Sequence, residues 1–216
     1  AIKKQKRDTI TLAYPDVKNY SAGKFMPHVG RTMDVISPLN GEIISTVPLS
    51  TANDLDEAVT SATTAFHAWS AMPVKERVQV FFKYKTLLEK HLQELAELCS
   101  EENGKTIGES IAEIEKCIEL TEFACSLPQL VTGELLEVSR GVECRTEHVP
   151  LGVVASIVPF NFPSMVPNWT LPNAIALGNC MIMKPSEKVP LSVGRLAELL
   201  KEAGLPEDGR VQLFDG

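Results

Sequence analysis

An asparagine between two prolines is the first residue in this sequence whose type and setting suit chemistry. The motif PFNFP, residues 159–163, directly follows an apolar segment at 152–158. Proline restricts the backbone, so the Asn161 amide could donate a hydrogen bond without reorganising as charge develops on a substrate oxygen. This pattern predicts an oxyanion donor for a tetrahedral intermediate. The alternative is an asparagine that satisfies its own backbone in a proline-rich turn.

A lysine and an acid follow the next apolar segment. Residues 179–184 are typical of a buried strand, and the motif KPSEK runs from Lys184 to Lys188. In a dinucleotide-binding unit, a residue at the end of the second strand meets the adenosine ribose hydroxyls. Lys184 can donate to a ribose oxygen, and the Glu187 carboxylate can accept from a hydroxyl. The alternative is an exposed pair at a helix start, where Glu187 suits the helix dipole.

The segments that position these residues alternate between strand and helix. Strands are expected at 152–158, 179–184 and 211–214, and helices at 165–177 and 191–203. The first strand is small and β-branched, as a strand buried on both faces should be. The alternation predicts a parallel α/β sheet, which binds ligands at the carboxyl ends of its strands. No GxGxxG motif follows the first strand, which argues against an ordinary dehydrogenase fingerprint.

The first part of the chain is typical of helices that follow a hairpin at Asn40-Gly41. Helices are expected from Ser50 or Thr51, from Pro73, over 92–101 and over 107–125. The apolar stripe of the first helix is expected to consist of Leu55, Val59, Ala62, Phe66 and Trp69. Residues 131–138 and 142–149 predict a β-ribbon around Arg140-Gly141.

Composition excludes several classes of protein. The chain has 216 residues, 44% of them hydrophobic, and a net charge of −7, which argues against binding a nucleic-acid backbone. No apolar run approaches the roughly 20 residues that span a bilayer. Four isolated histidines give no zinc spacing. An odd number of cysteines without close pairs indicates reduced thiols, in the cytoplasm or, in a eukaryote, the mitochondrial matrix; they are Cys99, Cys117, Cys125, Cys144 and Cys180.

Five short motifs follow one another in the second half of the chain. They are PLGVV at 150–154, PFNFP at 159–163, GNC at 178–180, KPSE at 184–187 and GLP at 204–206. In this order and spacing they resemble the aldehyde dehydrogenase superfamily. Phe160, where many members carry Trp, and ENGKT at 102–106 look most like the acylating methylmalonate-semialdehyde dehydrogenase branch. The resemblance runs from about Tyr20 to Gly216 and covers roughly the first half of a family member.

The resemblance implies NAD as the cofactor. Lys184 and Glu187 match residues that hold the adenosine ribose. Val158 and Phe160 match positions that line the nucleotide cleft, largely through their backbone, and Lys188 stands where the acylating branch often has Arg. Glu187 beside the ribose would repel a 2′-phosphate and so favours NAD over NADP, whereas Lys184 and Lys188 act in the opposite direction.

The resemblance also implies a reaction. The family oxidises an aldehyde through a thiohemiacetal on a cysteine, passes hydride to NAD, and releases the thioester to water or coenzyme A. Asn161 matches the oxyanion-binding Asn of the family. The cysteine motif, the catalytic Glu and the glycine-containing NAD loop are expected beyond Gly216, so the chain alone is expected to be inactive. Cys180, at the head of a buried strand, is expected to fill the core.

Substrate and partners are expected from the branch. The expected substrate is methylmalonate or malonate semialdehyde, converted to an acyl-coenzyme A. In this branch an Arg on the helix after the GKT segment helps to bind the substrate carboxylate; Lys116 is the nearest match here, and lysine lacks the bidentate fork. A non-acylating or succinate-semialdehyde dehydrogenase is therefore an alternative. A further alternative is an inactive fragment that binds nucleotide or pairs with a full-length subunit.

The expected organisation has three parts. Residues 1–128 form a helical part that contributes to the NAD-binding domain, and residues 129–150 form a β-ribbon for homo-oligomerisation. Residues 151–216 form the first part of a Rossmann-type core that ends before the catalytic domain. The predicted fold class is therefore α/β, with an incomplete Rossmann-type parallel sheet, N-terminal helices and a β-ribbon.

Overall fold

The computed structural model describes residues 12–206 and 210–214, so residues 1–11, 207–209 and 215–216 of the predicted parts lie outside the described residues. Its strands include β1 (Tyr20–Ser21), β2 (Lys24–Phe25), β7 (Val153–Ile157), β8 (Cys180–Lys184) and β9 (Val211–Leu213). These five form one sheet in the order β2-β1-β9-β8-β7. β7, β8 and β9 are parallel, and β1 is antiparallel to β9. The order β9-β8-β7 matches one half of a doubly wound sheet, which confirms the predicted fold class.

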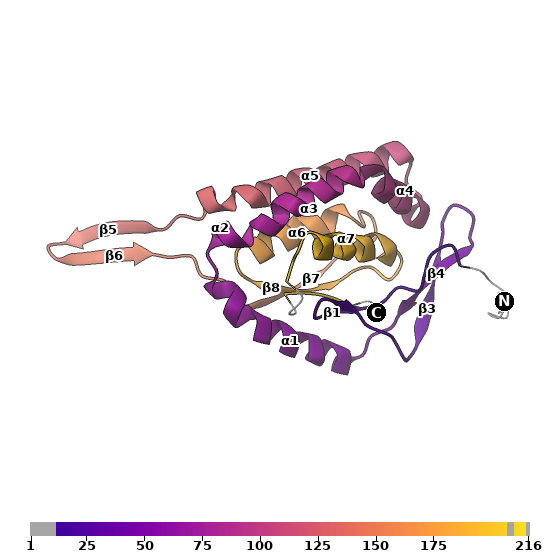
Figure 1. The fold of residues 1–216 in the computed structure, drawn as a ribbon, viewed down its shortest axis with the longest axis horizontal. Helices are drawn as coiled ribbons and strands as arrows, with labels where there is room; N and C mark the ends of the chain where they lie inside the picture. Colours follow the sequence, from indigo (N-terminus) through magenta and orange to yellow (C-terminus); the bar gives the residue numbers. More distant parts are fainter. Residues whose placement is uncertain (1–11, 207–209, 215–216) are drawn as a thin grey trace.

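Helices cover both faces of this sheet (Figure 1). Helix α1 (Ala52–Ala71) packs on one face, and α6 (Met165–Ala176) and α7 (Pro190–Glu202) lie on the other. A further helical layer covers α6 and α7; it consists of α2 (Val74–Arg77), α3 (Gln79–Lys90), α4 (Leu92–Asn103) and α5 (Ile107–Leu130). A separate hairpin of β3 (Thr32–Ile36) and β4 (Ile43–Pro48) confirms the predicted turn at Asn40-Gly41.

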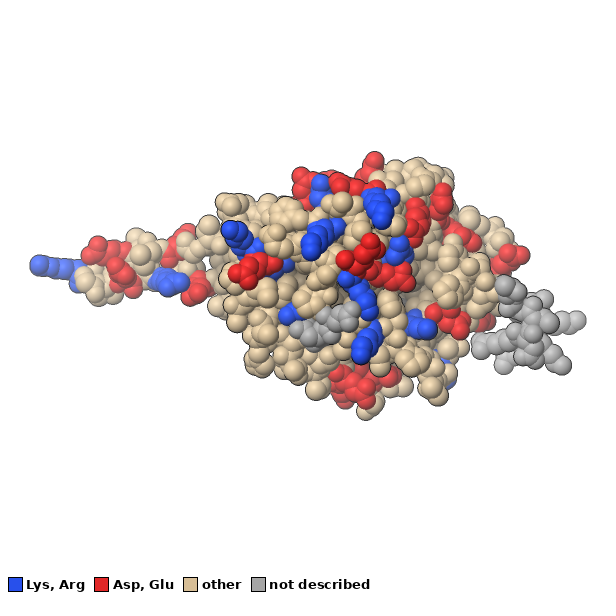
Figure 2. All heavy atoms as spheres, in the orientation of Figure 1, with Lys and Arg blue, Asp and Glu red and all other residues tan. Residues whose placement is uncertain are grey.

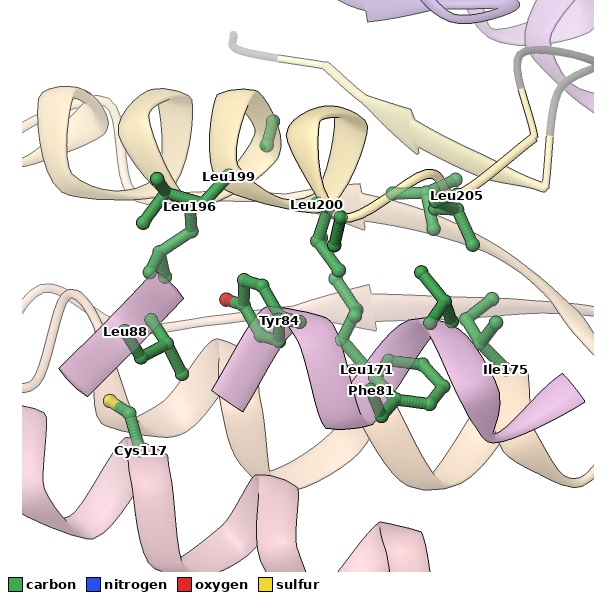
Figure 3. Close-up of a cluster of buried hydrophobic side chains, with 14 of the residues drawn as sticks. Phe81, Tyr84, Leu88, Cys117, Leu171, Ile175, Leu196, Leu199, Leu200 and Leu205 are labelled. Atoms are coloured by element: carbon green, nitrogen blue, oxygen red, sulfur yellow. The ribbon is translucent and has the colours of Figure 1, made fainter. Parts of the chain in front are cut away.

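The side chains of β8 alternate between the two faces of the sheet, so this strand packs against helices on both sides. Successive side chains of a strand point to opposite faces. Cys180 and Ile182 contact residues of α1, whereas Met181 and Met183 belong to the main core with α6 and α7. Figure 3 shows how this core continues outward: Tyr84 and Leu88 of α3 lie between the leucines of α7 and Cys117 of α5, and Leu171 of α6 lies beside Phe81. The core therefore fixes the sheet against both helical layers, and with it the carboxyl ends of the strands.

The predicted apolar stripe of α1 is wrong in part. The buried residues of this helix are Ala58, Ala62, Ala65 and Trp69. Leu55 and Val59 are instead 47% and 40% exposed. Small side chains allow the helix to approach β7 and β8 closely, so the alanines rather than the large apolar residues face the sheet. The helix begins as predicted, with Thr51 and Asp54 forming a capping box.

Two helix boundaries and the burial of one strand also differ from the predictions. The helix predicted from Pro73 is two helices, α2 and α3, which meet at Val78. Just before this junction Arg77 is buried and donates to the carbonyl oxygen of Ala176 at 2.8 Å, so α2 is tied to the end of α6. Helix α5 continues to Leu130 rather than ending near residue 125. Strand β7 is not buried on both faces among the described residues, since its Ile157 is 79% exposed.

The β-ribbon is present and projects from the body of the protein (Figure 1). It consists of the antiparallel strands β5 (Glu134–Ser139) and β6 (Val142–Thr146), in which every residue is exposed. Acidic and basic side chains both occur along it and across the face shown in Figure 2. Among the described residues, no helix is long and apolar enough to cross a membrane.

Candidate functional site

Two loops meet at the carboxyl edge of the sheet. The β7 loop, residues 158–164, joins β7 to α6, and the β8 loop, residues 185–189, joins β8 to α7. The strands are adjacent and parallel, with Ile157 paired to Lys184, and the Val158 N–H donates to the Lys184 carbonyl oxygen at 3.1 Å. The Lys188 Nζ lies 4.8 Å from the centroid of the Phe160 ring. The two predicted groups of site residues are therefore neighbours.

Asn161 occupies the exposed tip of the β7 loop. Its neighbours Phe160 and Phe162 are 50% and 37% exposed, whereas Pro163 and Ser164 behind them are buried. Within the described residues, the Asn161 side chain forms no hydrogen bond, so its amide protons are available to a ligand. If Asn161 only stabilised a proline-rich turn, its side chain would bond to the local backbone. No such bond occurs in the described part of the chain.

Lys184 and Glu187 form an ion pair beside this loop. The Lys184 Nζ lies 3.0 Å from the Glu187 Oε2 and also donates to the Pro185 carbonyl oxygen at 3.0 Å. The two side chains are 31% and 38% exposed. The backbone N–H of Glu187 and the Lys184 ammonium lower the pKa of the Glu187 carboxyl. The pair thus presents a donor and an ionised acceptor to solvent, the combination that a vicinal diol can bridge.

The two positions expected to act through their backbone are already engaged within the protein. Val158 is buried, and its N–H bonds to the carbonyl oxygen of Lys184. The Phe160 carbonyl oxygen accepts a hydrogen bond from the Asn103 Nδ2 at 2.8 Å. The Val158 N–H and the Phe160 carbonyl therefore hold the conformation of the loop. Of these two residues, only Phe160 exposes its side chain to solvent.

A buried glutamate holds the start of α6. The Glu113 Oε1 accepts from the backbone N–H groups of Ser164 at 2.8 Å and Met165 at 3.0 Å. Its Oε2 forms an ion pair with the Lys105 ammonium. The carboxylate satisfies N–H groups that have no partner inside the helix and lies at the positive end of the helix dipole. Sequence spacing could not reveal this residue, because its partners lie about fifty positions further along the chain.

A second buried glutamate holds the start of α7 in the same way. The Glu102 carboxylate accepts from the N–H groups of Leu191 and Ser192, each at 2.8 Å. Burial raises the pKa of Glu102 to about 7, against the opposing effect of these hydrogen bonds. The first turns of α6 and α7 are thus bonded to protein carboxylates, whereas an ordinary Rossmann unit offers its first helix to the pyrophosphate. In this chain Glu113 bonds the start of the helix that follows β7, and the β7 loop carries no GxGxxG motif.

A family model described as "Aldehyde dehydrogenase family" matches residues 25–214, a range that contains both loops and all the helices. The chain belongs to the aldehyde dehydrogenase family. It is 45% identical over 209 residues to malonate-semialdehyde dehydrogenase 1 of Geobacillus thermodenitrificans, which covers 96% of this chain and 43% of that protein. This aldehyde dehydrogenase chain therefore spans less than half the length of the curated relatives it matches.

Solved structures give the same family. The methylmalonate-semialdehyde dehydrogenase of Oceanimonas doudoroffii has a TM-score of 0.91 and 39% identity to this chain, and the match covers 94% of this chain and 42% of that one. A Sinorhizobium meliloti structure, assigned as a methylmalonate-semialdehyde dehydrogenase and determined with NAD, has a TM-score of 0.91 and 38% identity; here the match covers 96% and 42%. The predicted resemblance to this branch of the aldehyde dehydrogenases is confirmed.

None of the five cysteines of this aldehyde dehydrogenase chain lies in either loop. Cys99, Cys117 and Cys180 are buried, Cys125 is partly buried, and Cys144 lies on the exposed ribbon strand β6. Burial raises the pKa of the Cys99 thiol to about 12 and that of Cys125 to about 11. A thiol of raised pKa is a poor nucleophile at neutral pH. Cys180 packs against residues of α1, as expected for a core residue.

Lys116, the residue matched to the substrate-binding Arg of the branch, lies outside the two loops. Lys116 lies on α5, is 44% exposed, and forms an ion pair with Glu119 one turn later. Its ammonium is therefore open to solvent and paired with an exposed carboxylate. Among the described residues, no group of three or more His, Cys, Asp or Glu side chains could hold a metal ion.

Proposed function

We propose that the protein containing this chain is an NAD-dependent dehydrogenase that oxidises malonate or methylmalonate semialdehyde to an acyl-coenzyme A. The observation that carries this proposal is the juxtaposition of two loops: the β7 loop, which carries the exposed Asn161, adjoins the β8 loop, which carries the Lys184–Glu187 pair, at one edge of the sheet. Its support comes from relatives named for these substrates that are about 45% identical over most of this chain.

The Lys184–Glu187 pair is the proposed ribose site. A diol can accept from the ammonium and donate to the carboxylate, and each of these bonds involves a charged partner. NAD, when bound, accepts the hydride removed from the aldehyde carbon. Glu187 favours NAD over NADP in this proposal, because its ionised carboxylate would repel a 2′-phosphate. Lys188 faces the Phe160 ring, so its charge is partly directed toward that ring.

The Asn161 amide is the proposed oxyanion donor. When a thiolate attacks the aldehyde, the carbonyl oxygen gains negative charge, and a donor already held in place stabilises it. The thiolate is proposed to come from a cysteine outside these 216 residues, because the buried thiols here are inaccessible and the β6 thiol lies on the ribbon. The 216-residue chain alone is therefore proposed to be inactive, and aldehyde oxidation by the purified chain would contradict this.

A steady-state assay of the full-length protein tests the substrate and the acylating step. Malonate, methylmalonate and succinate semialdehydes are compared, each with NAD and with or without coenzyme A. We expect the highest kcat/KM with the malonate-type substrates, and turnover that depends on coenzyme A. Turnover independent of coenzyme A would exclude the acylating reaction, and a preference for succinate semialdehyde would exclude the proposed substrate.

One observation favours a non-acylating or succinate-semialdehyde dehydrogenase instead. Lys116 offers the substrate carboxylate a single point charge, where a guanidinium would provide a planar fork. Lys116→Arg and Lys116→Met test whether this ammonium binds the substrate carboxylate. If Lys116 binds a substrate carboxylate, Lys116→Met raises the KM for the semialdehyde and Lys116→Arg does not. Equal KM values in both variants would remove Lys116 from the site.

The ribbon is proposed to join copies of the protein into a homo-oligomer. Its two strands have unpaired edges, and such edges associate with other strands unless they are covered. Leu135, Leu136 and Val138 of β5 are each more than half exposed, which adds apolar surface to these edges.

A further inference from the structure

One short segment of the helical layer, residues 103–113, contacts the β7 loop on both sides of Asn161. Before Asn161, the Asn103 Nδ2 donates to the Phe160 carbonyl oxygen at 2.8 Å. After it, the Lys105 Nζ lies 3.9 Å from the centroid of the Phe162 ring. The same ammonium pairs with Glu113, which bonds the backbone at the start of α6.

The hydrogen bond from Asn103 acts directly on the backbone of Asn161. The Phe160 carbonyl and the Asn161 N–H belong to one planar peptide unit. A bond that fixes the direction of this carbonyl therefore fixes the plane from which the Asn161 side chain departs. Since the Asn161 side chain forms no hydrogen bond among the described residues, no hydrogen bond of its own sets its direction. The backbone on either side then becomes the main constraint on that direction.

The contacts after Asn161 complete this arrangement. The Lys105 side chain is 16% exposed and that of Glu113 1% exposed, so their ion pair is shielded from water. Through this pair the Phe162 ring and the first turn of α6 are tied to the same helical segment. The tip of the loop thus lies between two attachments, both made by residues that are distant from it in sequence and neither made by Asn161 itself.

We propose that Asn103 and the Lys105–Glu113 pair are positioning residues, which hold the Asn161 amide in the direction that oxyanion stabilisation requires. This inference rests on the proposed function of Asn161. Catalysis is sensitive to such positioning, since a misplacement of about 1 Å can cost roughly 100-fold in rate. Asn103 is the best residue to change, because it is only partly buried and its loss leaves no buried charge.

A double-mutant cycle on the full-length protein tests the inference. Asn161→Ala is expected to lower kcat about 100- to 1000-fold. Asn103→Ala is expected to lower kcat about tenfold with the KM for NAD unchanged, because it alters the direction of a donor and not the ribose site. In the Asn161→Ala background, Asn103→Ala should have no further effect on kcat, since it acts through the side chain already removed.

The opposite results separate two failures. If Asn103→Ala lowers kcat by the same factor in both backgrounds, the residue acts independently of Asn161, and the positioning inference alone is overturned. If Asn161→Ala keeps the wild-type kcat, Asn161 is not the oxyanion donor; the proposed role and the inference that rests on it are both overturned.

Two further variants test whether the loss of kcat in Asn103→Ala comes from partial unfolding. Asn103→Asp keeps the shape of the side chain but lacks the donor, so it should reproduce the loss in kcat. Gln79→Ala removes a comparable amide-to-carbonyl hydrogen bond, from the Gln79 Nε2 to the Lys75 carbonyl oxygen at 3.0 Å, on an exposed part of α3. This control should keep the wild-type kcat. A loss in Gln79→Ala as large as that in Asn103→Ala would overturn the inference.

Discussion

Removal of the Lys105 charge from its ion pair with Glu113 should lower the free energy of unfolding. Only 1% of the Glu113 side chain is exposed and 16% of that of Lys105, so removal of Lys105 leaves the Glu113 charge buried without its ionic partner. Breaking a buried pair in this way costs about 3–5 kcal/mol. Lys105→Met should lie near the lower end, because the Glu113 carboxylate still accepts from two backbone N–H groups.

The double variant Lys105→Met with Glu113→Gln should recover most of this loss. A glutamine keeps one oxygen to accept from the N–H groups of Ser164 and Met165, and no unpaired charge is left. Replacing both ions of a buried pair by neutral groups is often close to neutral in stability. The expected coupling energy between the two substitutions is therefore about 3 kcal/mol in magnitude, with the double variant more stable than the sum of the single losses predicts.

Urea unfolding of the full-length protein, followed by circular dichroism, measures each free energy in the cycle. The matched control is Lys85→Met. The Lys85 Nζ lies 2.9 Å from the Glu89 Oε1, but this pair is 26% and 48% exposed. An exposed pair contributes less than about 1 kcal/mol. A loss below about 1 kcal/mol for Lys105→Met, or strict additivity in the double variant, would refute the account of Glu113 as a buried, ion-paired helix cap.

Three further predictions concern the second buried carboxylate, the ribose site and the ribbon. Burial raises the pKa of Glu102 from 4.5 to about 7, so the folded state retains a proton that the unfolded chain releases. The stability contributed by this group is therefore fully present below pH 4.5 and is lost as the pH rises through about 7, by roughly 3 kcal/mol. Glu102→Gln should flatten the fall in unfolding free energy across this range, and unchanged pH slopes in urea unfolding would contradict the prediction. Lys184→Met removes a charged donor from the proposed ribose site and should raise the KM for NAD about 10- to 100-fold with little change in kcat; an unchanged KM in steady-state assays would exclude Lys184 from the site. Leu135→Glu places a charge on the ribbon and should lower the oligomer mass measured by light scattering, and an unchanged mass would argue against association through this face.

The parts of the fold that follow from local pattern were predictable from the sequence. Alternating apolar segments placed β7 and β8 side by side, and parallel strands bring their carboxyl ends to one edge. The proximity of Asn161 to Lys184 follows from these two facts. The resemblance to aldehyde dehydrogenases added the roles of these residues, because composition and spacing alone left a turn and a surface ion pair as alternatives.

Other features depend on contacts that local pattern does not contain. The alanines of α1 are buried because the helix lies close to the sheet. The predicted stripe favoured large apolar side chains and therefore included Leu55 and Val59, which are exposed. The small and β-branched composition of β7 likewise does not reveal that Ile157 is exposed among the described residues. Glu102 and Glu113 look like surface residues on charged helices. Only the packing of the helical layer over α6 and α7 makes them buried caps.

The kcat of Asn161→Ala in the full-length protein, with the Kd for NAD measured in parallel, shows whether this amide is the oxyanion donor. We expect a kcat about 100- to 1000-fold below wild type and a Kd for NAD within a few-fold of it, because the amide acts on the substrate oxygen and the ribose site lies in the neighbouring loop. A kcat close to wild type would exclude Asn161 as the donor, as would a loss of activity that arises entirely from weaker NAD binding.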